Sequence, residues 1–71
     1  MELRTIVTGS QTSAIKAKRH LEKGGIIAQV VRAPKYAEGC RFGIELLLAD
    51  LPHAISLLRE ARIEYTEILK T

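Results

Sequence analysis

The sequence predicts an α+β fold of the ferredoxin-like class, a β-α-β-β-α-β sandwich with a four-stranded antiparallel sheet and two helices on one face. Two segments have the apolar repeat of amphipathic helices, and four short segments have the composition or the alternation of strands. Their order along the chain is strand, helix, strand, strand, helix, strand. Because each half crosses over right-handed, both helices cover the same face, and we expect the first and third strands at the sheet centre. We expect the 71 residues to form one domain, 1–71.

The first half starts with a strand at residues 3–8, which is rich in β-branched side chains. A helix follows, and its apolar residues recur at helical spacing: Ala14, Ala17 and Leu21. Ser10 and Thr12 are both candidate N-caps, because a hydroxyl can accept from the free amides of the first turn. Gly24 and Gly25 predict the end of the helix, since glycine adopts the left-handed conformation without steric cost.

Two further strands are predicted on either side of a loop. Residues 26–32 form a β-branched run, and residues 33–39 contain a proline and a glycine that favour a loop. Residues 40–49 alternate with a period of two, which indicates a third strand. One face of that strand is predicted to point to the core: Phe42, Ile44, Leu46 and Leu48. The other face carries Arg41, Gly43 and Glu45.

The second helix and the last strand complete the fold. Asp50 is a predicted acidic cap, and Pro52 suits the first helical turn, where its missing amide costs nothing. The apolar stripe of this helix is broad: Leu51, Ala54, Ile55, Leu58 and Ala61. Residues 63–69 predict a short final strand.

The sheet face without helices is a candidate contact surface. It is expected to carry polar residues together with one parity set of apolar ones: Gln29, Gly43 and Glu45, with Ile27, Val31 or Leu47. Such a patch often pairs with another subunit. The alternative is a half-solvated sheet with scattered apolar residues, which is also common. Both interpretations stay open.

Composition excludes several classes of protein. A single cysteine allows no internal disulfide framework and no multi-cysteine zinc site, so we expect no metal and no cofactor. His20 and His53 are isolated and are predicted to be helix-surface residues. No apolar run approaches the ~20 residues of a membrane span, so we expect a cytoplasmic protein that does not bind membranes. The net charge of +3 is typical of ordinary solubility.

Nucleic-acid binding is not expected either. Ferredoxin-like sheets include RNA-recognition domains that stack bases on two or three aromatic side chains of the sheet. The run from Arg41 to Ile44 has a faint similarity to that pattern, but Phe42 has the parity of the core and no second aromatic accompanies it.

Cys40 is the strongest candidate for chemistry. It lies where the loop meets the third strand, and Gly39 removes bulk beside it. Arg41, Arg32 and Lys35 are candidate neighbours, and nearby cations favour the reactive thiolate. In the alternative interpretation Cys40 shares the parity of the core residues and simply packs, as most free cysteines do.

The chain resembles a known family over nearly its whole length. The residues that carry the resemblance are the run from Ser10 to Ala17, then Leu21 and Gly25, Arg32-Ala33-Pro34, and the run from Gly39 to Leu46. This pattern resembles the small bacterial family described as putative selenium/sulfur carrier protein-like. The most specific part is the proline-containing loop that leads through glycine and cysteine into an aromatic-Gly-Ile strand. A small residue commonly follows the cysteine in that family, whereas this chain has Arg41.

The resemblance implies a carrier role for Cys40. The thiolate would hold a persulfide or selenopersulfide, with Gly39 giving access and Arg41, Lys35 and Arg32 stabilising the anion. The implied partners are a donor enzyme similar to a cysteine desulfurase and an acceptor protein. The alternative from another class is a small regulatory or assembly module that pairs through its open sheet face, as a homodimer or with another protein, with Cys40 merely packed. Whether selenium or sulfur is carried stays open.

Overall fold

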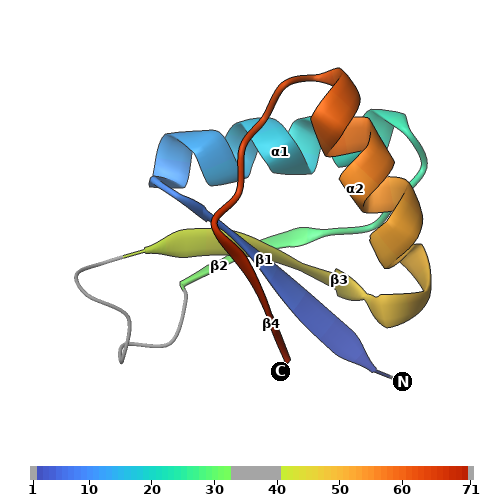
Figure 1. The fold of residues 1–71 in the computed structure, drawn as a ribbon, viewed down its shortest axis with the longest axis horizontal. Helices are drawn as coiled ribbons and strands as arrows, with labels where there is room; N and C mark the ends of the chain where they lie inside the picture. Colours follow the sequence, from blue (N-terminus) through green and yellow to red (C-terminus); the bar gives the residue numbers. More distant parts are fainter. Residues whose placement is uncertain (1, 33–40, 71) are drawn as a thin grey trace.

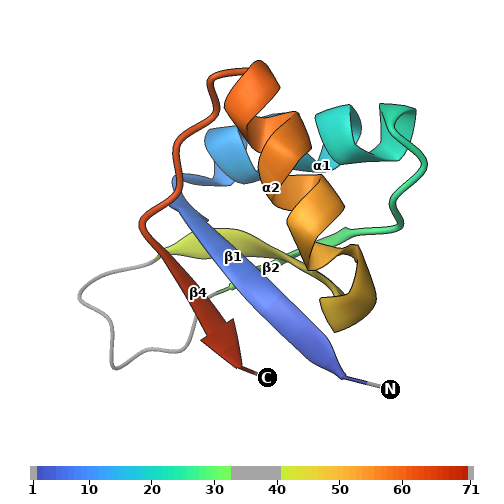
Figure 2. The same cartoon turned by 45° about the vertical axis from the view of Figure 1, so that its right-hand side comes forward.

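The computed structural model describes residues 2–32 and 41–70 and has an α+β architecture. Its elements are β1 (Leu3–Gly9), α1 (Gln11–Lys23), β2 (Gln29–Arg32), β3 (Phe42–Leu47), the 3-10 turn η1 (Leu48–Asp50), α2 (Leu51–Glu60) and β4 (Glu67–Lys70). The four strands form one antiparallel sheet in the order β2-β3-β1-β4, with β1 and β3 at its centre as predicted. Both helices lie on the same side of this sheet (Figure 1), and the turned view in Figure 2 agrees. The predicted loop 33–39 and Cys40 lie outside the described residues.

The core is built on one row of β-branched side chains that crosses the sheet. In the register of the strands Ile68 is opposite Ile6, Ile6 is opposite Ile44, and Ile44 is opposite Val30. Ile6 and Ile44 are fully buried, whereas Ile68 on the edge strand is 36% exposed. The helices cover the centre of this row with four buried residues: Ala17, Leu21, Ala54 and Leu58. Burial of apolar area at about 25 cal/mol per Å² therefore stabilises mainly the β1–β3 pair.

The two central strands approach closely at Gly43. A Cβ atom placed there would lie against the carbonyl of Ile6 and 3.0 Å from the Cα of Val7. Backbone cannot move aside as the end of a flexible side chain can. Glycine at this position therefore allows the close contact between β1 and β3.

Helix α1 starts and ends where the sequence predicts. Ser10, and not Thr12, is the N-cap: its hydroxyl accepts from the amide of Ser13 at 3.1 Å. The end is closed by Gly25, whose φ of +88° lies in the left-handed region, and the amide of Ile26 donates to the carbonyl of Leu21 at 3.0 Å. This closure satisfies a carbonyl that the helix itself leaves free.

The predicted cap of the second helix is wrong in one respect. Pro52 does lie in the first turn of α2, but the side chain of Asp50 makes no capping hydrogen bond. The reason is that η1 runs directly into α2, so Asp50 has helical dihedral angles, and the amide of Leu51 donates to the carbonyl of Leu48. A residue in that conformation does not present its carboxylate to the first-turn amides as an extended N-cap does.

Two strands begin later than predicted, and the reason is the same for both. β2 starts at Gln29, not at residue 26, and β4 starts at Glu67, not at residue 63. Ile26 and Ile63, which looked like first strand residues, instead donate their amides back to the preceding helices, at 3.0 Å and 2.9 Å. Both side chains pack on the core. They therefore close the helices before the strands begin.

The third strand is shorter than the predicted 40–49. Its described part is Phe42–Leu47, and the chain then turns into η1, where the amide of Leu48 donates to the carbonyl of Glu2 at 2.9 Å. Ile44 and Leu46 are buried as predicted, while Phe42 and Leu48 are only half-buried.

Candidate functional site

Two of the predicted site residues, Arg32 and Arg41, are described, and they flank residues 33–40, which connect β2 to β3. Cys40, Gly39 and Lys35 belong to this connection and lie outside the described residues. Arg32 is the last residue of β2, and Arg41 immediately precedes β3. An arginine therefore stands at each end of the connection. Arg32 is also opposite Phe42 in the register of β2 and β3. Since Cys40 is bonded to Arg41, the geometry around Arg41 defines the position from which the thiol-bearing segment departs.

Arg41 is bound to the far edge of the sheet. One guanidinium nitrogen donates to the hydroxyl of Thr66 at 2.6 Å, and the other lies 3.4 Å from a carboxylate oxygen of Glu67. The two side chains of the ion pair are 27% and 42% exposed, so the pair contributes about 0.2–1 kcal/mol. The guanidinium therefore reaches past the end of β1 to the start of β4, and Glu67 balances part of its charge.

Thr66 links this arginine to the central strand. Its amide donates to the carbonyl of Val7 at 2.8 Å, and its hydroxyl donates to the same carbonyl at 3.3 Å while it accepts from Arg41. The start of β3 is thus held to β4 and β1 by one continuous chain of hydrogen bonds. This network gives residue 41 a defined orientation.

Arg32 lies at the opposite edge of the sheet. Its guanidinium carbon is 5.9 Å from the centre of the Phe42 ring, within the range of a cation–π contact worth about 0.5–1 kcal/mol at an exposed site. The structure therefore holds the two arginines at different edges: Arg41 turns to β4, and Arg32 stays over Phe42 beside β2.

The pairing of β1 with β3 is irregular at this same end. Val7 is opposite Gly43, but Gly9 is opposite Phe42, so Thr8 is an extra residue in β1. The hydroxyl of Thr8 donates to the carbonyl of Phe42 at 3.3 Å. Such bulges redirect a strand and are over-represented beside functional sites.

Three residues of this hydrogen-bonded region were not predicted from the sequence. Thr8, Thr66 and Glu67 carry no motif. Thr8 meets Phe42 because β1 pairs with β3, and Thr66 and Glu67 meet Arg41 because β1 pairs with β4 as well. The histidines differ in burial. His53 is exposed as predicted, but His20 is half-buried, and its Nε2 is shielded from solvent with no hydrogen-bond partner in the described structure.

Within residues 2–32 and 41–70, no three His, Cys, Asp or Glu side chains gather as metal ligands. None of the described helices is long and apolar enough to cross a membrane.

Comparison with known proteins gives one match. The family model described as "Putative Se/S carrier protein-like" matches residues 4–70. No curated protein and no solved structure matches the chain. The match begins at the second residue of β1 and covers both helices, the other three strands and the connection that contains Cys40. The chain therefore belongs to the putative Se/S carrier protein-like family.

Proposed function

We propose that this protein carries sulfur or selenium as a persulfide or selenopersulfide on Cys40. The family match supports the proposal most strongly, because it spans the segment that contains the only cysteine of the chain. In this proposal the protein is a carrier that partner proteins load and unload, rather than an enzyme with its own turnover. A ferredoxin-like class for the fold is part of the proposal, supported by the two β-α-β halves and the central position of β1 and β3.

One cysteine is sufficient for this chemistry. The Cys40 thiolate attacks the outer sulfur of a persulfide on a donor enzyme of the cysteine desulfurase type. A bond forms between Cys40 and that sulfur, the sulfur–sulfur bond of the donor breaks, and the donor leaves as a thiolate. An acceptor thiolate then attacks the outer sulfur on Cys40 and releases the Cys40 thiolate. Each step exchanges one sulfur–sulfur bond for another, so no external oxidant or reductant is consumed.

The residues proposed to assist are Gly39, Arg41, Lys35 and Arg32. Gly39 gives access, and the three cations favour the thiolate over the thiol. The orientation of Arg41 bears on access to the thiol, because a small residue commonly stands at this position in the family. The guanidinium of Arg41 lies against Thr66 and Glu67, so its bulk is directed to β4. A cytoplasmic setting, where thiols stay reduced, completes the proposal.

A second candidate function rests on the open face of the sheet. Ile27 is 82% exposed, and it lines a shallow depression with Leu3, Leu47 and Gln29 at the end of the sheet away from Arg41. An isoleucine so exposed beside other apolar side chains suits a contact with a second copy of the chain. In this case the protein is an assembly module. Sedimentation at increasing concentration should then show a dimer that Ile27→Glu abolishes, whereas a monomer at every concentration would exclude this candidate.

The rate of alkylation of Cys40 tests the carrier proposal against a packed thiol. In the native protein the alkylation rate, followed against pH, should give a Cys40 pKa below the ordinary value of a free thiol. Arg41→Gln should raise that pKa, while the matched charge removal Lys70→Gln should not. A thiol that resists alkylation in the native protein, and reacts only after unfolding, would contradict the proposal.

A further inference from the structure

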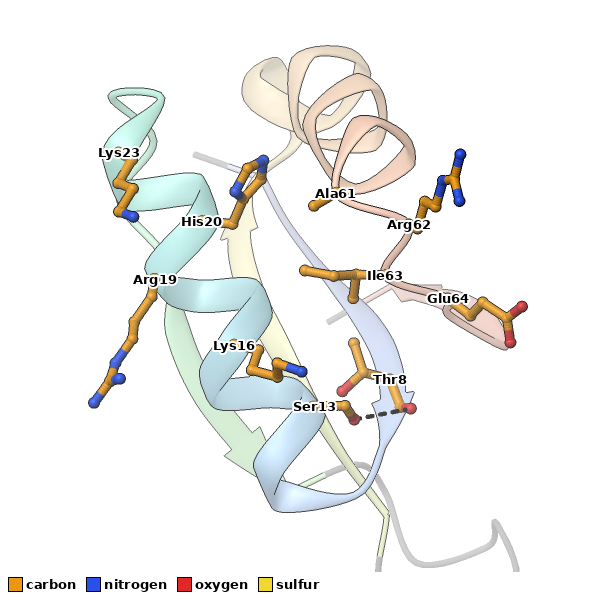
Figure 3. A pocket seen from close by; sticks show the side chains of 10 residues that line it. All are labelled: Thr8, Ser13, Lys16, Arg19, His20, Lys23, Ala61, Arg62, Ile63 and Glu64. Atoms are coloured by element: carbon orange, nitrogen blue, oxygen red, sulfur yellow. Dashed lines mark hydrogen bonds between the residues drawn. The ribbon is translucent and has the colours of Figure 1, made fainter.

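A groove of about 640 Å³ runs between α1 and the segment 61–64 that connects α2 to β4 (Figure 3). Its α1 side contributes Lys16, Arg19, His20 and Lys23, which are spaced so that they follow one side of the helix. The opposite side contributes Arg62 and Glu64. Neither Arg32 nor Arg41 lines the groove, and the proposed sulfur chemistry does not use its charges.

The residues around this groove account for the basic excess of the whole chain. The chain has eleven Lys and Arg residues against eight Asp and Glu residues. Four of those eleven and one of those eight line the groove, which leaves seven against seven elsewhere. A net charge of +3 spread over the surface would only aid solubility, but concentrated on one groove it attracts an anionic partner.

The arrangement of the charges favours an extended anion over a single small one. Figure 3 shows Lys16 directed across the groove, Arg19 directed away from the segment 61–64, and Arg62 directed outward. The cationic groups therefore do not converge on one point, as donors to one phosphate do. Ser13 and Lys23, the first and last α1 residues of the lining, are about 15 Å apart at the rise of a helix. An extended peptide spans that length with about five residues.

The remaining lining favours a peptide over a nucleic acid. Ala61 and Ile63 form an apolar part of the wall, and Figure 3 shows Ile63 directed toward α1. Among the described residues no Phe, Tyr or Trp lines the groove, whereas single-stranded nucleic acids bind by stacking on aromatic rings. His20 also lines the groove, and its Nε2 is shielded from solvent with no hydrogen-bond partner in the described part of the chain.

Arg62 is held on the rim in a strained conformation. Its φ of +57° is the only positive value at a residue other than glycine among the described residues. The left-handed conformation is unfavourable for a residue with a Cβ atom, and strain of this kind concentrates at functional positions. A glycine would close α2 without that cost but would remove one cation from the groove.

The lower end of the groove reaches the start of β3. Thr8 lines it, accepts a hydrogen bond from the Ser13 hydroxyl at its carbonyl (dashed in Figure 3), and donates through its own hydroxyl to the carbonyl of Phe42. Phe42 follows Cys40 by two residues. A segment bound in the groove therefore ends beside the strand from which the thiol-bearing connection departs.

We infer that this groove docks an extended acidic segment, with at least one apolar side chain, from a protein partner. Only the identity of that partner, a donor or acceptor of sulfur, rests on the proposed function. The carboxylates of the segment pair with Lys16 and Lys23 along α1 and, at the rim of the groove, with Arg62, and its apolar side chain packs on Ile63.

The test is the binding of a fluorescent peptide of about eight residues, rich in glutamate and with a central leucine. Anisotropy should show saturable binding at low salt that weakens as salt screens the charges. The double variant Lys16→Gln/Lys23→Gln should bind the peptide about tenfold more weakly. The matched control Arg59→Gln/Lys70→Gln removes the same charge from outside the groove and should bind as the unmodified protein does. Glutamine keeps the helix propensity of lysine, so both proteins should fold.

Three results would overturn the inference. They are equal weakening by the two double variants, displacement of the peptide by millimolar inorganic phosphate, and tighter binding of a single-stranded RNA of similar length. The measurement needs no thiol chemistry. Loss of peptide binding and failure of sulfur loading are therefore separate results.

Discussion

The two helices of this protein end in the same way but with different residues. At the end of α1 the amide of Ile26 donates to the carbonyl of Leu21, and at the end of α2 the amide of Ile63 donates to the carbonyl of Leu58. In both closures the residue before the isoleucine has a positive φ. It is Gly25 after α1 and Arg62 after α2.

We interpret Gly25 as a residue that serves only the closure of α1, and Arg62 as one that closes α2 and also serves the proposed docking groove. Gly25 closes α1 at little steric cost, and a Cβ atom there would meet nothing within 4 Å. Arg62 closes α2 with a strained backbone and contributes a cation to the groove. If the groove docks an acidic segment as proposed, the second half of the molecule gives up stability at Arg62 for a surface charge beside that groove.

The largest expected effect tests whether the two halves are equivalent in the core. Leu21 and Leu58 are both fully buried, and both belong to the same cluster. Leu21→Ala and Leu58→Ala should each lower the free energy of unfolding by about 3 kcal/mol, measured by urea denaturation. If one of them changed it by less than about 1 kcal/mol, the two halves would not share the core as described.

The next effect concerns the glycine closure. Gly25→Ala should lower the free energy of unfolding by about 1–2 kcal/mol, because alanine is strained at a φ of +88° even where space is available. Thr12→Ala, at an exposed position inside α1, serves as the control and should change it by no more than about 0.5 kcal/mol. An equal effect of the two changes would show that the left-handed closure is not the reason for the glycine.

The two helix starts also differ, and they predict a smaller effect. Ser10→Ala removes a side-chain cap and should cost about 1 kcal/mol in urea denaturation. Asp50→Ala removes a side chain that makes no capping bond and should change stability by less than about 0.5 kcal/mol. The reverse order would mean that α2 depends on its acidic residue after all.

The smallest effect has the opposite sign. Arg62→Gly should raise the free energy of unfolding by about 0.5–1 kcal/mol, since relief of the strained backbone exceeds the entropy cost of glycine. The same change should weaken binding of the acidic peptide. Arg59→Gly, in the last turn of α2, should instead destabilise by about 1 kcal/mol. If Arg62→Gly also destabilised the protein, the arginine would have a structural role that the closure does not reveal.

The order of elements and much of the core were predictable from the sequence. Period and composition gave both helices and the four strands, and they gave the burial of Leu21, Ile44 and Leu58. Ile26 and Ile63 were misassigned to strands because a β-branched residue after a helix looks the same whether it starts a strand or closes the helix. Only the hydrogen bonds to Leu21 and Leu58 distinguish the two cases.

The site was predictable only where it is contiguous in sequence. Arg41 was recognised beside Cys40, but its partners on β4 were not, because Thr66 and Glu67 lie about 25 residues away and meet it only through the sheet order. The groove was missed for a similar reason. In the sequence, Lys16 and Lys23 have the spacing of an ordinary solvated helix face, and only the fold places Ile63 and Arg62 opposite them.

The most direct test of the carrier proposal is the intact mass of the protein after incubation with a cysteine desulfurase and cysteine. We expect an added mass of one sulfur atom, removed by a thiol reductant and absent in the Cys40→Ser protein. Selenocysteine and a matching lyase would test selenium in the same way. An unmodified Cys40 in a donor mixture that loads a known acceptor thiol, or an adduct that persists in Cys40→Ser, would contradict the proposal.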